Sequence, residues 1–182
     1  MFTKTSRKPP TVKLFPITAK SPLNATLWVR ILNRFLYYAN LRFSKMTGGR
    51  YEIVRGESRD KRISAGLEIS VRDNFNNKER DISSLSGGES FQASLALALG
   101  LSDIIQQRNG GIRLDSIFID EGFGSLDNDS LASAIETLND LTGNGNRLVG
   151  IISHISELKN SIGNKIEVVG TKSGSSIKII TD

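Results

Sequence analysis

Apolar residues recur at helical spacing in two long segments of the chain. In residues 24–45 they share one face, and Asn24 is positioned to cap the helix that this pattern predicts. A second helix is expected from about Gly88 to Gln107, and Gly110-Gly111 ends it. Its apolar face is expected to contain Phe91, Leu95, Ala98, Leu99, Ser102 and Ile105. Shorter helices are expected at residues 129–141 and 155–160.

Patterns typical of strands lie before and after the second long helix. Residues 51–55 and 63–72 alternate in polarity, whereas residues 73–81 predict a polar loop and residues 143–146 a turn. Short apolar runs predict buried strands at residues 116–120 and 147–153, and a terminal hairpin is expected at residues 166–169 and 176–180. The alternation of helices and strands after residue 88 predicts an α/β fold with a mainly parallel sheet flanked by helices.

Positive charge is concentrated at the start of the chain. Residues 1–50 contain ten basic and no acidic residues, although the net charge of all 182 residues is only +5. Such a cluster attracts polyanions such as nucleic acid, or forms a solvated arm. All four prolines lie in residues 1–22, so we expect an irregular basic leader there and one domain over residues 23–182.

Composition excludes several kinds of site. The sequence has no cysteine and a single histidine, which excludes disulfides, thiolate metal sites and multi-histidine metal sites. It has no apolar run of about 18 residues and no secretory signal. We therefore expect no membrane partner and a cytoplasmic location.

A glycine motif, Leu85-Ser86-Gly87-Gly88-Glu89, directly precedes the second long helix. Adjacent glycines let a ligand approach the backbone closely, and the positive end of a helix favours an anion such as phosphate. Ser86 adds a hydroxyl donor at the same place. Without further context, the same residues would form an ordinary loop that ends in a helix cap.

An acidic pair, Asp120-Glu121, ends the apolar run at residues 116–120. Ligands of α/β proteins bind at the carboxyl edge of the sheet, where these two side chains are expected. Asp120 is a candidate for holding Mg²⁺ through water, and Glu121 for polarising an attacking water. Ser125-Leu126-Asp127 follows the pair, and His154 ends the next predicted strand, where an imidazole can donate to a γ-phosphate.

The order of these motifs resembles the C-terminal lobe of ABC-type ATPase heads, with P-loop NTPase-like architecture, over about residues 24–182. The resemblance implies a signature motif at residues 85–89, a Walker B strand at 117–121, a D-loop at 125–127 and a switch histidine at His154. Residues 120–127 (DEGFGSLD) and 39–51 (ANLRFSKMTGGRY) resemble SbcC-type, SMC-like DNA-repair ATPases. ABC transporters usually have Pro-Thr after the acidic pair, and SMC proteins a different sequence.

In that family two heads sandwich two ATP molecules. The resemblance implies nucleotide contacts across the dimer from Ser86, Gly87, Gly88, Glu89 and Asp127. It implies that Asp120, Glu121 and His154 serve the ATP and Mg²⁺ of their own head. It also implies a homodimer, an SbcD-like nuclease partner, and double-stranded DNA as the substrate of break processing.

One departure from the family is large, because the sequence contains no Walker A motif (G-x-x-x-x-G-K-[ST]). We therefore expect ATP hydrolysis to need an N-terminal Walker A lobe of the same protein, and this chain to be inactive alone. A fragment, a split-gene product and a degenerate copy all fit this expectation. The alternatives are a non-catalytic DNA-binding or interaction protein derived from such a lobe, or the nucleotide-binding domain of an SMC protein or an ABC transporter.

Overall fold

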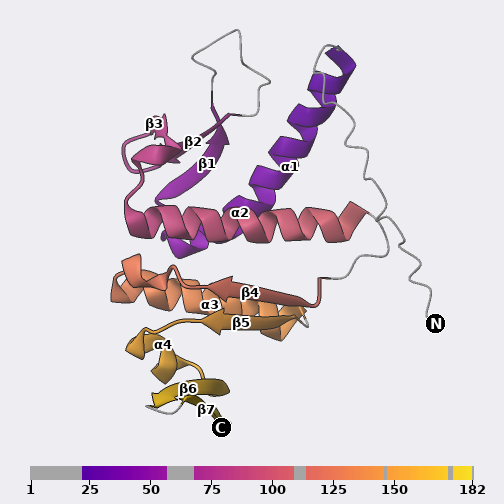
Figure 1. Ribbon diagram of the computed structural model, residues 1–182. Helices are drawn as coiled ribbons and strands as arrows, with labels where there is room; N and C mark the ends of the chain where they lie inside the picture. The colour runs from indigo at the N-terminus through magenta and orange to yellow at the C-terminus, as the bar shows by residue number, and fades with distance from the viewer. Residues whose placement is uncertain (1–21, 57–67, 109–113, 146, 172–173, 182) are drawn as a thin grey trace, which may run out of the picture.

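The computed structural model describes residues 22–56, 68–108, 114–145, 147–171 and 174–181. Helices and strands alternate along this part of the chain (Figure 1). The helices are α1 (Pro22–Met46), α2 (Gly87–Arg108), α3 (Asn128–Gly145) and α4 (Ser156–Ser161), with the 3-10 turns η1 (Ile82–Ser84) and η2 (Phe123–Ser125). The strands are β1 (Tyr51–Arg55), β2 (Ile69–Asp73), β3 (Lys78–Asp81), β4 (Ser116–Asp120), β5 (Leu148–Ile152), β6 (Lys165–Thr171) and β7 (Gly174–Ile180).

Helix α2 crosses the middle of the molecule. Helix α1 and strands β1–β3 lie on one side of α2, and α3, β4 and β5 lie on the other (Figure 1). Strands β1–β3 form an antiparallel sheet, β4 and β5 a parallel pair, and β6 and β7 an antiparallel hairpin beyond α4. The predicted α/β class is confirmed, with parallel pairing confined to β4 and β5 among the described strands.

Three local predictions were wrong. Residues 78–81 form strand β3 rather than a loop, because Arg72 of β2 pairs with Glu79 of β3 at 2.7 Å and gives a polar strand a partner. Residues 143–145 continue α3 rather than turning. Two residues of the predicted apolar face of α2, Ala98 and Ile105, are exposed. The leader predicted at residues 1–22 lies almost entirely outside the described residues.

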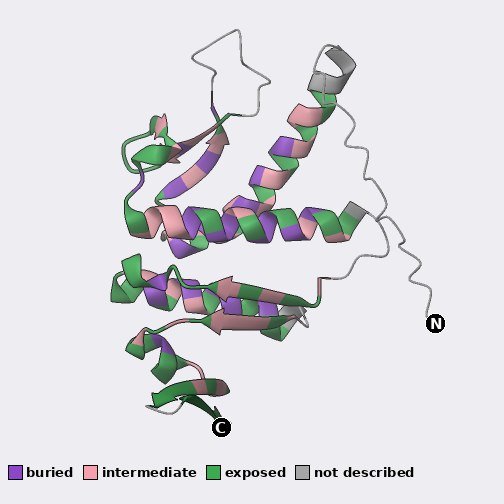
Figure 2. Cartoon of the chain, in the orientation of Figure 1, coloured by how far each residue is buried: buried purple, intermediate pink, exposed green. Residues whose placement is uncertain are grey.

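The buried face of α2 is broad because the helix packs on two sides (Figure 2). It consists of Gln92, Ala93, Leu95, Ala96, Leu99, Gly100, Ser102 and Ile104. Gly100 lies against α1 so closely that a Cβ there would be 2.7 Å from the backbone nitrogen of Ala39. The crossing of α1 and α2 therefore depends on the missing side chain of Gly100.

Polar side chains of α1 fix the helix to its neighbours. The side-chain amide of Asn40 accepts from the backbone N–H of Ile53 and donates to its carbonyl, both at 2.8 Å. These two bonds satisfy the backbone groups of Ile53 at the outer edge of β1. Arg42 pairs with Asp103 of α2 at 2.7 Å, and Arg147 binds the other oxygen of Asp103 at 3.0 Å. Lys45 contacts Asp140 of α3 at 2.6 Å. Part of the basic charge of the first 50 residues thus joins elements within the fold.

Among the described residues, no helix combines the length and the apolar character that crossing a membrane requires.

The close crossing of α1 and α2 predicts that replacing glycine by alanine changes the free energy of unfolding in opposite directions at two helical positions. Gly100→Ala should lower the free energy of unfolding by about 1–3 kcal/mol, because its methyl group would push two backbones apart. Gly143→Ala in α3, where nothing lies within 4 Å of the new Cβ, should raise it by up to about 1 kcal/mol. Denaturant unfolding of both variants measures the difference. A shift of both variants in the same direction would contradict the account.

Candidate nucleotide site

The glycine motif folds into the first turn of α2 as a reciprocal cap. The hydroxyl of Ser86 accepts from the backbone N–H of Glu89 at 3.3 Å, and the carboxylate of Glu89 accepts from the N–H of Ser86 at 2.9 Å. This is a capping box, which satisfies two of the donors that a helix N-terminus leaves unpaired. The N–H groups of Gly87 and Gly88 have no backbone acceptor among the described residues. The helix therefore begins with open donors where an anion is favoured.

The surroundings of Glu89 favour the ionised form of its carboxyl group. Partial burial opposes its charge, but hydrogen bonds from the Ser86 backbone and from the hydroxyls of Tyr51 and Ser86, with the nearby Arg80, hold the pKa of the Glu89 carboxyl below its ordinary value. The carboxylate is thus an anion at neutral pH. Its hydrogen bonds point into the protein rather than toward a ligand.

A hollow of about 510 Å³ opens beside this helix end. Its lining includes Ser86, Gly87, Gly88 and Glu89, together with Arg50, with Ser125 of η2, and with Asp127, Asp129 and Ser130 beyond η2. Arg50 is the one cation among these lining residues, and its guanidinium lies 4.7 Å from the ring centroid of Tyr51. The hollow thus combines helix-end donors and one arginine, which favour a phosphate group, with the carboxylates of Glu89, Asp127 and Asp129, which oppose it.

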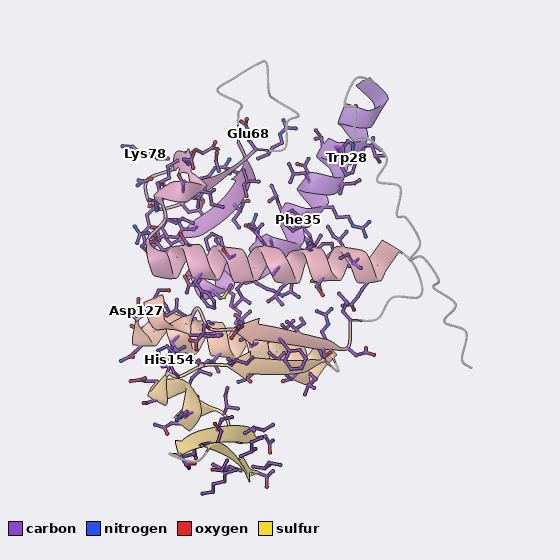
Figure 3. The ribbon with its side chains drawn as sticks, viewed as in Figure 1. Trp28, Phe35, Glu68, Lys78, Asp127 and His154 are labelled. Atoms are coloured by element: carbon purple, nitrogen blue, oxygen red, sulfur yellow. The ribbon has the colours of Figure 1, made fainter. Side chains whose placement is uncertain are left out.

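Asp127 lies at the start of α3, on the rim of this hollow (Figure 3). Its carboxylate accepts from the backbone N–H of Ser130 at 2.8 Å and from the Ser130 hydroxyl at 3.1 Å. These bonds hold the pKa of the Asp127 carboxyl below its ordinary value. Asp127 is thus an N-cap that joins α3 to the hollow.

The acidic pair and the histidine meet at the carboxyl ends of β4 and β5. Parallel register places Asp120 opposite Ile152, and the N–H of Glu121 extends the pairing by donating to the Ile152 carbonyl at 2.9 Å. The Nδ1 atom of His154 lies 3.0 and 3.1 Å from the two carboxylate oxygens of Glu121. An ionised carboxylate only accepts hydrogen bonds, so Nδ1 carries the proton and Nε2 is left for a ligand.

The turn after Glu121 is sterically constrained. Glu121 has a φ of 58° and Gly122 a φ of 97°, both in the left-handed region. A Cβ on Gly122 would lie 2.3 Å from the ring of Phe91, which packs edge-on against Phe123 with centroids 4.8 Å apart. Helix α2 thereby holds the turn that aims the Glu121 carboxylate.

The residues around Asp120 fit a magnesium ion that is bound mainly by a nucleotide. Asp120 is exposed, and its carboxylate has no hydrogen-bond partner among the described residues. No group of three or more potential ligand side chains gathers there or elsewhere in the described chain. Mg²⁺ commonly binds one carboxylate, directly or through water, and completes its shell with phosphates and waters.

The structure places the predicted site residues in two groups. Ser86, Gly87, Gly88, Glu89 and Asp127 surround the hollow, whereas Asp120, Glu121 and His154 form the strand-end group. Turn η2 lies between the two groups, and Ser125 contacts the glycines of the first: a Cβ on Gly88 would be 2.9 Å from its carbonyl oxygen. Arg50, Tyr51 and Arg80 border the first group and were missed. Arg50 and Tyr51 lie more than 30 residues before the motif, and Arg80 lies in a segment that was predicted to be a loop.

Comparisons with known proteins identify the family of the chain. Residues 57–140 match the family described as "SbcC/RAD50-like, Walker B motif". The chain is 50% identical over 164 residues to the SbcC subunit of nuclease SbcCD from Vibrio cholerae, and 53% identical over 153 residues to the protein of the same name from Staphylococcus epidermidis. These matches cover 90% and 84% of this chain, but only 16% and 15% of the relatives.

Solved structures of low sequence identity share the fold. The SMC head domain from Thermotoga maritima matches with a TM-score of 0.58 and 21% identity, over 87% of this chain and 52% of that one. A structure reported under "Structural biochemistry of ATP-driven dimerization and DNA stimulated activation of SMC ATPases" matches with a TM-score of 0.66 and 15% identity, over 86% of this chain and 89% of that one.

The fold and the order of its motifs define the C-terminal lobe of an SMC-like, ABC-type ATPase head. Sequence identity of 50–53% to the SbcCD relatives identifies the branch of this class to which the chain belongs. The chain belongs to the SbcC-type family of these ATPases.

The capping box predicts a pH-dependent stability. Because the folded-state pKa of Glu89 lies below its ordinary value of 4.5, its contribution is complete above that pH and is lost as the pH falls through the lower folded value. Glu89→Gln retains a capping-box residue but does not titrate. Wild type should therefore lose more unfolding free energy than Glu89→Gln between about pH 6 and 3. Equal losses in urea unfolding at the two pH values would contradict the assignment.

Proposed function

We propose that the chain is one half of an ATP-driven SbcC-type head that processes DNA double-strand breaks. The observation that supports the proposal is that the predicted site residues form two separate groups, each a candidate half-site: the helix end at Ser86 to Gly88, and the Glu121–His154 pair at the strand ends. Two separate half-sites suit a sandwich in which each lobe contacts two nucleotides. The family membership supports ATP and Mg²⁺ as the ligands.

In this proposal the strand-end group acts on the nucleotide of its own head. Asp120 would hold Mg²⁺, which would supply charge stabilisation to the phosphates. The Glu121 carboxylate accepts a hydrogen bond from the attacking water and polarises it. With Nδ1–H on Glu121, donation from Nε2 of His154 to the γ-phosphate would require the ring to carry a second proton.

The first group acts on the nucleotide of a second head. The Ser86 hydroxyl and the N–H groups of Gly87 and Gly88 would donate to its γ-phosphate, where the helix dipole favours negative charge. Asp127 lies at the rim of the same hollow, where it would couple the two sites across a homodimer.

A bare apolar sheet face supports the need for a Walker A lobe. Strands β4 and β5 bury Ile117, Ile119, Val149 and Ile151 against the core on one face. On the other face Phe118, Leu148 and Ile152 are 71%, 65% and 57% exposed. Two strands with one uncovered apolar face are marginal in water. We infer that the N-terminal Walker A lobe of the same protein covers this face.

The remaining partners rest on the family alone. The SbcCD relatives extend far beyond this chain, which covers only about one sixth of their length. An SbcD-like nuclease and double-stranded DNA are therefore proposed as partners of the whole protein in the cytoplasm. Arg42 and Lys45 of α1 pair with acidic residues of the fold. Because these two side chains are paired within the fold, they argue against α1 as a dedicated DNA-binding surface.

Mixing the two lobes tests the proposal. The chain alone should hydrolyse no ATP, and adding a separately expressed Walker A lobe should produce turnover in a phosphate-release assay. Glu121→Gln should lower that turnover by at least about 100-fold, because the amide cannot take the developing proton, while nucleotide-dependent association of the heads persists. Turnover by the chain alone, or full activity of Glu121→Gln in the mixture, would contradict the proposal.

A further inference from the structure

The Glu89 carboxylate contacts both the signature motif and the antiparallel sheet. On the motif side it accepts from the N–H of Ser86 at 2.9 Å. On the sheet side it lies 3.7 Å from a guanidinium nitrogen of Arg80, in β3. It also faces the hydroxyl of Tyr51, in β1, which helps to hold the pKa of Glu89 low. One carboxylate thus joins the motif to β1 and β3.

Tyr51 is held rigidly enough to serve as an anchor. Its side chain is only 2% exposed, and its ring stacks on Phe43 of α1 with centroids 6.3 Å apart. Burial and the neighbouring Glu89 carboxylate raise the pKa of the Tyr51 phenol, so the hydroxyl remains protonated and donates to Glu89. Arg50 and Arg80 lie over the same ring, at 4.7 and 5.3 Å from its centroid.

Arg80 holds the loop that enters the motif. Its guanidinium donates to the backbone carbonyl of Ser84 at 2.8 Å and to the Ser84 hydroxyl at 3.3 Å. The same side chain therefore contacts the residue two positions before Ser86, the ring of Tyr51 and the carboxylate of Glu89. Its several donors allow these contacts at once.

The consequence for Ser86 is that both of its polar groups face Glu89. The Ser86 oxygen accepts from the N–H of Glu89 at 3.3 Å, and its hydroxyl helps to hold the pKa of the Glu89 carboxyl below its ordinary value. The Ser86 N–H is also bound by Glu89, at 2.9 Å. The outward donors of the motif in this structure are thus the N–H groups of Gly87 and Gly88.

We propose that Tyr51 and Arg80 are positioning residues of the signature motif, which act through Glu89 to hold Ser86 and so fix the direction of the Gly87 and Gly88 N–H groups. Glu89 then supports the donors instead of contacting the nucleotide itself, because an anionic carboxylate repels a phosphate. The antiparallel sheet β1–β3 thereby sets the geometry of the helix end. This inference rests on the proposed function only for its effect on turnover.

Tyr51→Phe tests the inference in the 182-residue chain without nucleotide. The variant keeps the buried ring and removes the hydroxyl that holds Glu89. Tyr38→Phe is the matched control, because it removes a tyrosine hydroxyl that bonds Gln107 at 2.9 Å, away from the motif. Amide hydrogen exchange at Ser86 should be about tenfold faster in Tyr51→Phe, as expected for a weakened charged hydrogen bond, and unchanged in Tyr38→Phe.

Two results would overturn the inference. Unchanged exchange at Ser86 in Tyr51→Phe would show that the hydroxyl does not hold Glu89. Faster exchange throughout the fold would show that Tyr51 is only a packing residue. Glu89→Gln, which still completes a capping box, should retain more protection at Ser86 than Glu89→Ala, and equal loss in both variants would count against the link.

A second readout uses the head assembled with the Walker A lobe. Tyr51→Phe should lower turnover at saturating ATP by about tenfold, since a weakened charged hydrogen bond has an effect of that order, without changing the ATP concentration that gives half-maximal turnover. Tyr38→Phe should change neither value. Unaltered turnover in Tyr51→Phe would overturn the positioning role. If the wild-type assembly shows no turnover, the proposed function fails, and amide exchange alone then decides whether Tyr51 positions Ser86.

Discussion

Helix α2 packs tightly on both sides, and this constraint fixes the position of the signature motif. On one side α1 crosses so closely that Gly100 meets the backbone of Ala39. On the other, Phe91 packs against Phe123 of η2. Close packing against backbone and rings leaves the helix little freedom to slide or rotate. Its first turn is therefore held between the sheet β1–β3 and turn η2, where the donors of the motif are exposed.

The same packing keeps the two half-sites apart while connecting them. Turn η2 contacts the glycines of the motif through Ser125, and the ring of Phe91 presses on Gly122, next to Glu121. A displacement of α2 would therefore move residues in both groups of predicted site residues. The Walker A lobe that we propose would account both for the uncovered face of β4 and β5 and for the absence of a Walker A motif from this sequence.

Local sequence patterns predicted the helices, because apolar periodicity there reflects burial. They also predicted the strands β4 and β5 and the hairpin, although the apolar residues of the hairpin are largely exposed. Chain order also predicted that Glu121 and His154 would follow neighbouring strands, and the structure brings them to 3.0 Å. Strand β3 was missed because cross-strand ion pairs, such as Arg72 with Glu79, replace apolar alternation. The contact of Tyr51 with Glu89 was missed because it depends on how β1 packs beside α2, which no spacing encodes.

The central claim is that Ser86 and Glu121 of one head serve different nucleotides. The most direct test mixes two inactive heads, one carrying Ser86→Arg and the other Glu121→Gln, each assembled with the Walker A lobe. If the claim holds, every mixed pair contains one intact composite site, and random pairing should restore about a quarter of wild-type turnover. Turnover no higher than that of either variant alone would show that both residues act on one nucleotide and would contradict the account.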